Sequence, residues 1–429
     1  MRLAIIRQSY TPQGGAERFL EGALEALLER NVAITLYTRE WPQTKLQLIE
    51  PSIVDPFYVG RLWRDAGFAR AVTQRIMRGR FNLVQSHELV LTCDVYRPAE
   101  GVYATWLEER LRDASGSQRL RAAMSPLNRY KLGMERKLFG SPWLRRVLCN
   151  SKLVRDDIKA RYGLTDERLP VLYNAVDSHA FSPELAMHRE RIRGKHKIAH
   201  DAMVYLLVGS DFQRKGLNAT LEALARIQEP AHLVVVGEDP AIDTFKTKAR
   251  ELGVRGRVTF AGFQSEVGPY YGAADAFVLP ALYDALPDAA MEALACGLPV
   301  VTSTKSGAAE LVTENDAGFV CGSRDVEALT RHMQALQAAD VRAKLGENAR
   351  NAVLPLSPAS MTLKLVLIYK ELLEFSIAHK LAEKAAARRD PTAPAEAPPL
   401  HGEDGLESET LPHPGGDSEA PVQPPAPER

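Results

Sequence analysis

Short apolar segments alternate with amphipathic helical segments along most of the chain, and this alternation limits the fold more than any other feature. The segments that read as strands cover residues 3–7, 33–39, 82–87, 146–151, 170–174, 202–210, 232–238, 258–263, 276–282 and 299–305. Those in the second half are apolar without alternation, as expected of strands covered on both faces. The pattern predicts parallel sheets built from βα units.

Two domains of this kind are expected, because 429 residues are too many for one ordinary core when domains average about 150 residues. We predict an α/β protein with two doubly wound Rossmann-like domains, residues 1–174 and 201–356, facing each other across a cleft. A polar, basic linker covers 175–200. A helical pattern over 357–389 is long enough to leave one domain and brace the other. In such sheets ligands bind at the carboxyl ends of the strands.

The last segment, 390–429, differs in composition from the rest. It is rich in Pro, has few large apolar residues and holds nine acidic residues against one Arg. We expect it to be disordered, because it cannot bury enough surface to offset the entropy of ordering. The formal net charge of zero therefore sums an acidic tail of about −8 and a basic body of about +8.

Composition also excludes several classes of protein. The first ten residues lack the apolar core of a secretion signal, and we expect no membrane span, because no later segment approaches the roughly 20 apolar residues that would cross a bilayer. We therefore expect a cytoplasmic protein. Its four cysteines are scattered without metal-ligand or redox spacing, which predicts reduced core residues and no metal site. They are Cys93, Cys149, Cys296 and Cys321.

Two loops that follow strands carry candidate binding residues. Gly14 and Gly15 precede a helical pattern, where the backbone could approach an anionic group, although a plain tight turn explains them equally well. Arg214 and Lys215 lie between a strand and a helix, where two cations suit a diphosphate. A solvated charge pair is the alternative for these cations. The loop with paired glycines is not the GxGxxG of dinucleotide-binding enzymes.

A third loop and helix, "YDALPDAAMEALACG", place two acids on either side of a helix start. Asp284 lies in the loop, Glu292 lies more than a turn inside the helix, and Gly297 follows its end. The arrangement suits a nucleotide sugar, with one acid on sugar hydroxyls and the other on ribose hydroxyls. A helix with one solvent-facing Glu would explain Glu292 but not the loop.

Taken together, these pieces resemble the retaining family 4 glycosyltransferases of the GT-B fold, over roughly residues 1 to 380. The matching motifs are "GGAER", "NAVDSHAFSP", "GSDFQRKG", "VVVGED", "VTFAGF" and the acid pair that ends in "EALACGLPVV". Within this family, the chain is most similar to the lipopolysaccharide core glucosyltransferases, which share "GGxxR" and "VGSDFxRKG".

The resemblance implies roles for the donor-binding residues. Glu292 would bind the ribose, Arg214 and Lys215 the diphosphate and its departing charge, and Gly14 and Gly15 the phosphate side from the other domain. The family has Glu where this chain has Asp284. Because Asp is shorter by one methylene, its reach to the donor sugar hydroxyls is open.

Two further residues follow the strands of the first half. The family often has a His near the donor sugar at the position of His87, although a packed or solvated His fits nearly as well. Asp94 is expected on the same side, facing the acceptor.

The resemblance also implies the reaction: transfer of a hexose with retention, from a nucleoside diphosphate sugar, with UDP-glucose as the expected donor, to a glycolipid such as lipopolysaccharide core. The leaving phosphate would help to deprotonate the acceptor, so neither a cofactor nor a metal is implied. Two alternatives stay open. One is a nucleotide-sugar epimerase, which shares the fold, and the other is a non-catalytic binder of sugar nucleotides.

The segment from Trp106 to Arg146 predicts contact with an anionic membrane, and hence a peripheral location on the inner face of the cytoplasmic membrane. It holds ten Arg or Lys against four acids, interleaved with aromatic and aliphatic residues. The residues expected at the membrane are Trp106, Arg119, Arg121, Arg129 and Lys131. A basic helical insertion packed on the first domain is the alternative. Nucleic acid is not an expected partner, since no recognition motif accompanies the charge.

Overall fold

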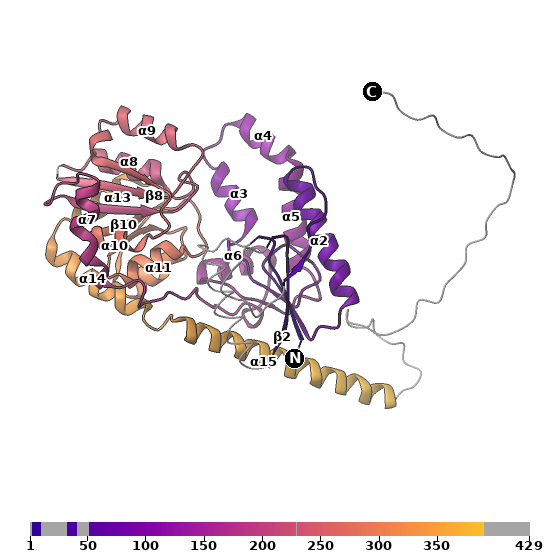
Figure 1. The fold of residues 1–429 in the computed structure, drawn as a ribbon. Helices are drawn as coiled ribbons and strands as arrows, with labels where there is room; N and C mark the ends of the chain where they lie inside the picture. Colours follow the sequence, from indigo (N-terminus) through magenta and orange to yellow (C-terminus); the bar gives the residue numbers. More distant parts are fainter. Residues whose placement is uncertain (1, 10–31, 41–50, 229, 390–429) are drawn as a thin grey trace, which may run out of the picture.

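The structure is a computed structural model that describes residues 2–9, 32–40, 51–228 and 230–389, with side chains as far as Glu374 (Figure 1). Gly14, Gly15, the helical pattern that follows them and the segment 390–429 lie outside the described residues, so the expectations for them stay predictions. The described chain forms two six-stranded parallel sheets. The predicted α/β fold with two Rossmann-like domains is confirmed.

The N-terminal domain is built on a sheet of order β3-β2-β1-β4-β5-β6. Its strands are β1 (Arg2–Ile6), β2 (Ala33–Thr38), β3 (Ser52–Ile53), β4 (Leu83–Ser86), β5 (Val95–Tyr96) and β6 (Arg146–Val147). The helices described between them are α2 (Gly60–Arg78), α3 (Tyr103–Leu111), α4 (Gly116–Met124), α5 (Pro126–Phe139), α6 (Lys152–Tyr162) and the 3-10 turn η1 (Asp166–Arg168).

The C-terminal domain has a sheet of order β12-β11-β10-β7-β8-β9. Its strands are β7 (Met203–Val208), β8 (Ala231–Val236), β9 (Val258–Gly262), β10 (Ala276–Leu279), β11 (Val300–Ser303) and β12 (Gly318–Cys321). Its helices are α8 (Leu217–Ala225), α9 (Ile242–Glu251), η3 (Arg255–Arg257), α10 (Gly268–Ala273), α11 (Asp288–Ala295), α12 (Ala308–Glu314), α13 (Val326–Ala335) and α14 (Ala339–Val353).

Strand β1 shows why its sequence is apolar without a break. Successive side chains of a strand point to opposite faces. Leu3 and Ile5 therefore lie in one core cluster, while Ala4 and Ile6 lie in another on the other face of the sheet. The four cysteines are buried and free, as the sequence predicted.

The segment 175–200 is not an open linker. It contains the 3-10 helix η2 (Pro183–His188) and the helix α7 (Arg189–Lys195), which pack on α10 of the C-terminal domain. Arg193 is buried there, and its guanidinium lies 2.8 Å from a carboxylate oxygen of Asp275. At least one basic residue of this segment therefore belongs to a buried ion pair of the C-terminal domain.

Helix α15 (Pro358–Arg389) follows the C-terminal domain and runs along the N-terminal domain (Figure 1). Its buried side chains complete the core on one face of the N-terminal sheet together with Leu3 and Ile5. These side chains are Met361, Leu365, Tyr369 and Leu372. A helix that leaves one domain and braces the other is what the helical pattern over 357–389 predicts.

One stretch of the described chain, Ala339–Glu374, is long and apolar enough by length and composition to cross a membrane, with 28% of its apolar window buried. The reading that no segment approaches this limit is therefore wrong. The stretch was missed because charged residues such as Lys364 and Lys370 interrupt the apolar run. It spans all of α14 and the start of α15, and the apolar side chains of α15 pack on the N-terminal sheet.

Candidate active site at the domain interface

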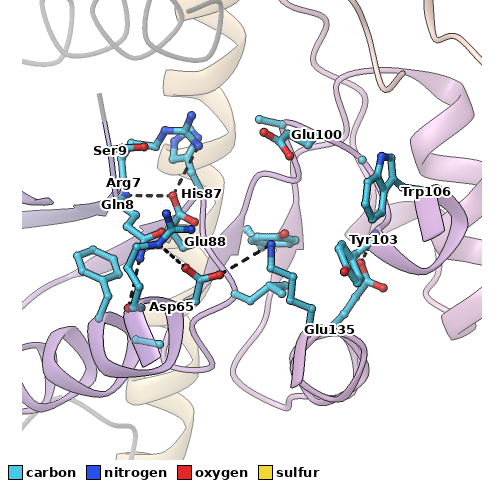
Figure 2. A pocket seen from close by; sticks show the side chains of 18 of the residues that line it. Arg7, Gln8, Ser9, Asp65, His87, Glu88, Glu100, Tyr103, Trp106 and Glu135 are labelled. Carbon is cyan, nitrogen blue, oxygen red and sulfur yellow. Dashed lines mark hydrogen bonds and ion pairs between the residues drawn. The ribbon is translucent and has the colours of Figure 1, made fainter. Parts of the chain in front are cut away.

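A cavity of about 480 Å³ opens at the carboxyl ends of β1 and β4 and reaches Asp211 and Arg214 of the C-terminal domain. Figure 2 shows that its labelled side chains form two facing groups, with Arg7, His87 and Glu88 on one side and Tyr103 and Trp106 on the other. The cavity therefore lies where a parallel sheet is expected to bind a ligand.

The wall at the strand ends holds Arg7 and Glu88. The Glu88 Oε1 atom accepts a hydrogen bond from the backbone N–H of Gln8 at 3.0 Å and lies 3.6 Å from the Arg7 guanidinium. Burial raises the pKa of Glu88, and Arg7 opposes this rise. A carboxyl group of this kind can accept a hydrogen bond from a sugar hydroxyl or, when protonated, donate one.

His87 lies beside Glu88 and is buried. Its Nε2 atom is 3.0 Å from the side-chain nitrogen of Gln85. Burial lowers the pKa of His87 well below its usual range, and the positive charges of Arg7 and Arg97 lower it further. This environment favours the neutral imidazole. The structure places His87 in the wall of the cavity, which excludes the solvated alternative; a packed His fits its burial, and its place near the donor sugar stays a prediction.

The opposite wall is the first turn of α3, which carries Tyr103 and Trp106. Their ring centroids are 5.2 Å apart and the rings are tilted by 30°. The carboxylate of Glu135, from α5, accepts hydrogen bonds from the backbone N–H groups of Tyr103 at 2.6 Å and Ala104 at 3.1 Å. Glu135 thus caps α3 and fixes the aromatic pair, although it also lines the cavity.

Charged side chains from α2 and α5 close one end of the cavity. The carboxylate of Asp65 accepts a hydrogen bond of 2.9 Å from Arg64 Nε and lies 3.8 Å from the Lys131 ammonium. The same ammonium lies 5.2 Å from the centre of the Tyr103 ring. Lys131 therefore belongs to the cavity and not to a membrane-facing surface, which corrects the sequence expectation.

On the C-terminal side, the structure brings Lys215 and Asp284 together from the loops after β7 and β10. Lys215 Nζ lies 2.6 Å from Asp284 Oδ2, and Arg214 lies 3.8 Å from the same oxygen. Burial would raise the pKa of Asp284, but the charges of Lys215 and Arg214 outweigh it and hold the pKa below its ordinary value. Lys215 is therefore not part of a solvated charge pair.

Gly216 makes this arrangement possible. Its φ of +81° lies in the left-handed region, and a Cβ atom there would lie 2.2 Å from the carbonyl oxygen of Pro280. The close approach packs the start of α8 against the loop after β10, and so places Arg214 and Lys215 beside Asp284.

Glu292 lies one turn inside α11 and is 5% exposed. Its Oε2 atom accepts a hydrogen bond of 2.8 Å from the hydroxyl of Tyr271 in α10. The alternative of a solvent-facing Glu is therefore wrong. At the start of the same helix, Asp288 accepts a hydrogen bond of 2.9 Å from Asn174 of the N-terminal domain.

Several contacts that no sequence motif predicted hold the two domains together beside the cavity. The hydroxyl of Tyr283 accepts a hydrogen bond of 2.9 Å from the backbone N–H of Val102. Glu109, near the end of α3, lies 3.1 Å from Arg324 and 3.2 Å from Lys305. The aromatic wall is therefore fixed to the C-terminal domain as well as to α5.

Two assignments from the sequence need correction. Asp94 precedes β5 at the amino end of the sheet, where its carboxylate accepts a hydrogen bond of 2.8 Å from Val84 N–H. It does not line the cavity, so its geometry does not fit an acceptor-facing role. Trp106 lines the cavity instead of facing a membrane, and Phe139 of the same segment is buried in the core.

The described part of the chain contains no group of three or more His, Cys, Asp or Glu side chains arranged to hold a metal ion.

Comparison with known proteins agrees with the fold. Residues 13–180 match the family described as Glycosyltransferase Family 4, and residues 188–352 match Glycosyl transferases group 1. The lipopolysaccharide glucosyltransferase WaaG of Escherichia coli strain K12 is 27% identical over 361 residues, covering 82% of this chain and 94% of WaaG. A crystal structure of WaaG superposes with a TM-score of 0.74 at 26% identity, over 85% of this chain and 99% of the other.

A shorter match is the lipopolysaccharide core biosynthesis glycosyltransferase LpsE of Rhizobium meliloti strain 1021. It is 30% identical over 162 residues, covering 38% of this chain and 47% of LpsE.

Two Rossmann-like domains with a cavity between their strand ends define a GT-B fold. The chain belongs to the GT-B glycosyltransferases that combine a family 4 domain with a group 1 domain.

Proposed function

We propose that the protein transfers a hexose, with retention, from UDP-glucose to a glycolipid of the lipopolysaccharide core. One observation carries the proposal: Lys215, Arg214 and Asp284 converge at the carboxyl ends of β7 and β10, and Arg214 of this cluster lines the cavity of the N-terminal domain. The names of WaaG and LpsE support the lipopolysaccharide acceptor, and that of WaaG supports glucose as the sugar.

The donor would lie with its diphosphate at Arg214 and Lys215. The developing charge on the leaving phosphate would be stabilised by these cations, which the fold has already oriented. Glu292, held by Tyr271, would bind the ribose hydroxyls. Asp284 would then divide its carboxylate between Lys215 and a sugar hydroxyl. Its short side chain is consistent with this, because the 2.6 Å contact to Lys215 keeps its Oδ2 atom at the cations.

The acceptor would occupy the cavity in the N-terminal domain. Tyr103 and Trp106 offer aromatic faces for an apolar sugar face, while Glu88 and Glu100 offer oxygens for hydroxyl groups. The departing phosphate would take the proton of the attacking hydroxyl on the same side of the sugar. Catalysis would rest on positioning and on charge stabilisation, so no metal or cofactor is assigned.

The epimerase alternative is less well supported. It requires side chains that move protons at the sugar, whereas His87 is buried with its pKa well below the usual range. A non-catalytic binder of sugar nucleotides is the remaining alternative. The buried Lys215–Asp284 pair could bind a sugar nucleotide in such a protein as well as in a transferase.

We place the protein at the inner face of the cytoplasmic membrane, where a lipid-linked acceptor would be presented. The support is an exposed apolar strip at the start of α2, with Phe57 87% and Trp63 59% exposed. Arg64 and Asp65 of the same helix line the cavity, so the strip lies close to it.

Mass spectrometry of the purified protein with a panel of sugar nucleotides, with and without lipopolysaccharide core, tests the function. UDP release from UDP-glucose should accelerate with the acceptor, and the product should gain the mass of one hexose, with the retained anomeric configuration read by NMR. A second sugar nucleotide of the same mass, separated by chromatography, would instead identify an epimerase. Binding without turnover of any donor would identify a binder.

A further inference from the structure

Helix α15 reaches the candidate active site through a chain of buried hydrogen bonds. The hydroxyl of Tyr369 donates to Gln85 Oε1 at 2.6 Å, and Gln85 Nε2 lies 3.0 Å from His87 Nε2. All three residues are buried. They connect a helix that follows the C-terminal domain to the wall of the cavity in the N-terminal domain.

The alternation of side chains along β4 explains why Gln85 can reach Tyr369. Leu83 of β4 packs in the core cluster that contains Tyr369, while the next residue, Val84, belongs to the cluster on the other face. Gln85 is two residues beyond Leu83 and therefore lies on the α15 side of the sheet. A buried amide among apolar residues is costly unless it is hydrogen-bonded. Tyr369 supplies one partner from a position where Phe would fill the same space.

We propose that Tyr369 is a positioning residue for His87, acting through Gln85 to fix the tautomer and orientation of the imidazole in the cavity. The hydroxyl of Tyr369 donates to the amide oxygen, which turns the amide nitrogen toward His87. An amide nitrogen can only donate, so His87 Nε2 must be the acceptor and Nδ1 must carry the hydrogen. The role of His87 in transfer rests on the proposed function, but the tautomer does not.

The same geometry opposes protonation of His87, since an imidazolium would place N–H against N–H at Gln85. The charged groups near the ring are Arg7, Arg97 and Glu88, and the two arginines act in the same direction as Gln85. Removing the Tyr369 hydroxyl should free the amide to turn its oxygen toward Nε2. That change would populate the Nε2–H form and raise the pKa of His87.

Nitrogen-15 NMR of the full chain labelled at histidine tests the inference without an activity assay, with His87→Gln to assign the signal. His87 should show an acceptor-type Nε2 and a protonated Nδ1, and Tyr369→Phe should shift the balance toward Nε2–H. Tyr205→Phe is the matched control, because the Tyr205 hydroxyl donates at 2.6 Å to the Met333 carbonyl, within the C-terminal domain. It should leave the His87 signals unchanged.

Kinetics supply a second readout. Tyr369→Phe should lower kcat about tenfold, the factor expected from one lost hydrogen bond, with KM for the donor unchanged and the acid limb of the pH profile moved to higher pH. In a Gln85→Met background, Tyr369→Phe should have no further effect.

Gln85→Glu keeps an acceptor for Tyr369 and places an oxygen against Nε2, so it should move the hydrogen to Nε2 even if Tyr369→Phe folds poorly. Unchanged His87 signals in both Tyr369→Phe and Gln85→Glu would overturn the inference. Absence of turnover with the expected NMR response would count against the proposed function alone.

Discussion

The ammonium of Lys215 lies 2.6 Å from the carboxylate of Asp284, although 69 residues separate them in the chain. Both residues are buried, at 8% and 6% exposure. A buried ion pair is costly to break because the remaining charge loses its partner. The pair therefore fixes the loops after β7 and β10 to each other at the proposed donor site.

Lys215→Ala and Arg214→Ala should both lower kcat/KM by about 100-fold, since each removes a charged contact to the leaving diphosphate. Their effects on folding should differ. Lys215→Ala leaves Asp284 buried beside the more distant Arg214 and should lower the free energy of unfolding by about 3 kcal/mol. Arg214→Ala should be close to neutral for folding, as its side chain is 25% exposed. Urea titrations and steady-state kinetics test both. Near-normal activity of both variants would contradict the diphosphate assignment.

Asp284 should also make stability depend on pH. Its pKa is lower in the folded than in the unfolded chain, so its contribution is present above the unfolded value of about 3.9 and is lost as pH falls through the folded value. Asp284→Asn should therefore lose less stability than the wild type between pH 5 and pH 3. Urea unfolding at the two pH values measures this difference. An equal loss of unfolding free energy in the wild type and in Asp284→Asn would show that the pair does not depress the pKa of Asp284.

Substitutions of Asp284 and Glu292 should differ in their effect on nucleotide binding. Asp284→Ala should abolish transfer and leave UDP affinity nearly intact, whereas Glu292→Ala should weaken UDP binding about tenfold, as expected for lost hydrogen bonds to a charged group. Tyr271→Phe removes the hydroxyl that orients Glu292 and should give a smaller loss in the same direction. Calorimetry with UDP measures all three. An equal loss of affinity in Asp284→Ala and Glu292→Ala would contradict the division of roles.

Sequence periodicity located the longer strands but missed two of the short ones. Strands β3 and β5 have two residues each, too few to carry a period, and they exist because neighbouring strands pair with them. The site divides in the same way. Arg214, Lys215, Asp284 and Glu292 could be found because each follows a strand end or a helix start.

Partners across the chain could not be found in that way. Nothing near Asp284 in the sequence indicates Lys215, and 284 residues separate Gln85 from Tyr369. The one local sign was a Gln directly after the apolar residues Leu83 and Val84 of a strand, at "NLVQSH". The aromatic wall was misread because the amphipathic helices α3 and α5 present rings to the cavity with the same spacing that suits a membrane surface.

The contact between Arg324 and Glu109 should hold the two domains close. Arg324→Ala should increase the radius of gyration in small-angle X-ray scattering, and UDP should reverse part of that increase. Stability should fall by less than about 1 kcal/mol, because the pair is partly exposed. Arg331→Ala is the matched control, since Arg331 pairs with Glu327 within one helix. Identical scattering of the two variants would mean that other contacts hold the interface.

Membrane binding should depend on two adjacent groups of exposed residues. The apolar group includes Phe57 and Trp63, and the basic group contains Arg119, Arg121 and Arg129 of α4 and α5. The start of α2 lies beside α5, where Lys131 is 3.8 Å from Asp65. Each exposed cation contributes about 1 kcal/mol near an anionic surface.

Vesicle co-sedimentation measures this binding. Binding should require anionic lipid, weaken with salt, and fall both when Arg119, Arg121 and Arg129 are changed to Gln and in Phe57→Ser/Trp63→Ser. The matched control changes the same number of exposed arginines in the C-terminal domain, Arg191, Arg250 and Arg331, to Gln, and should bind as the wild type does. An equal loss in the control would show that total charge governs binding. Equal binding of the wild type to neutral vesicles would reject the electrostatic part, because an apolar strip alone does not distinguish the two lipids.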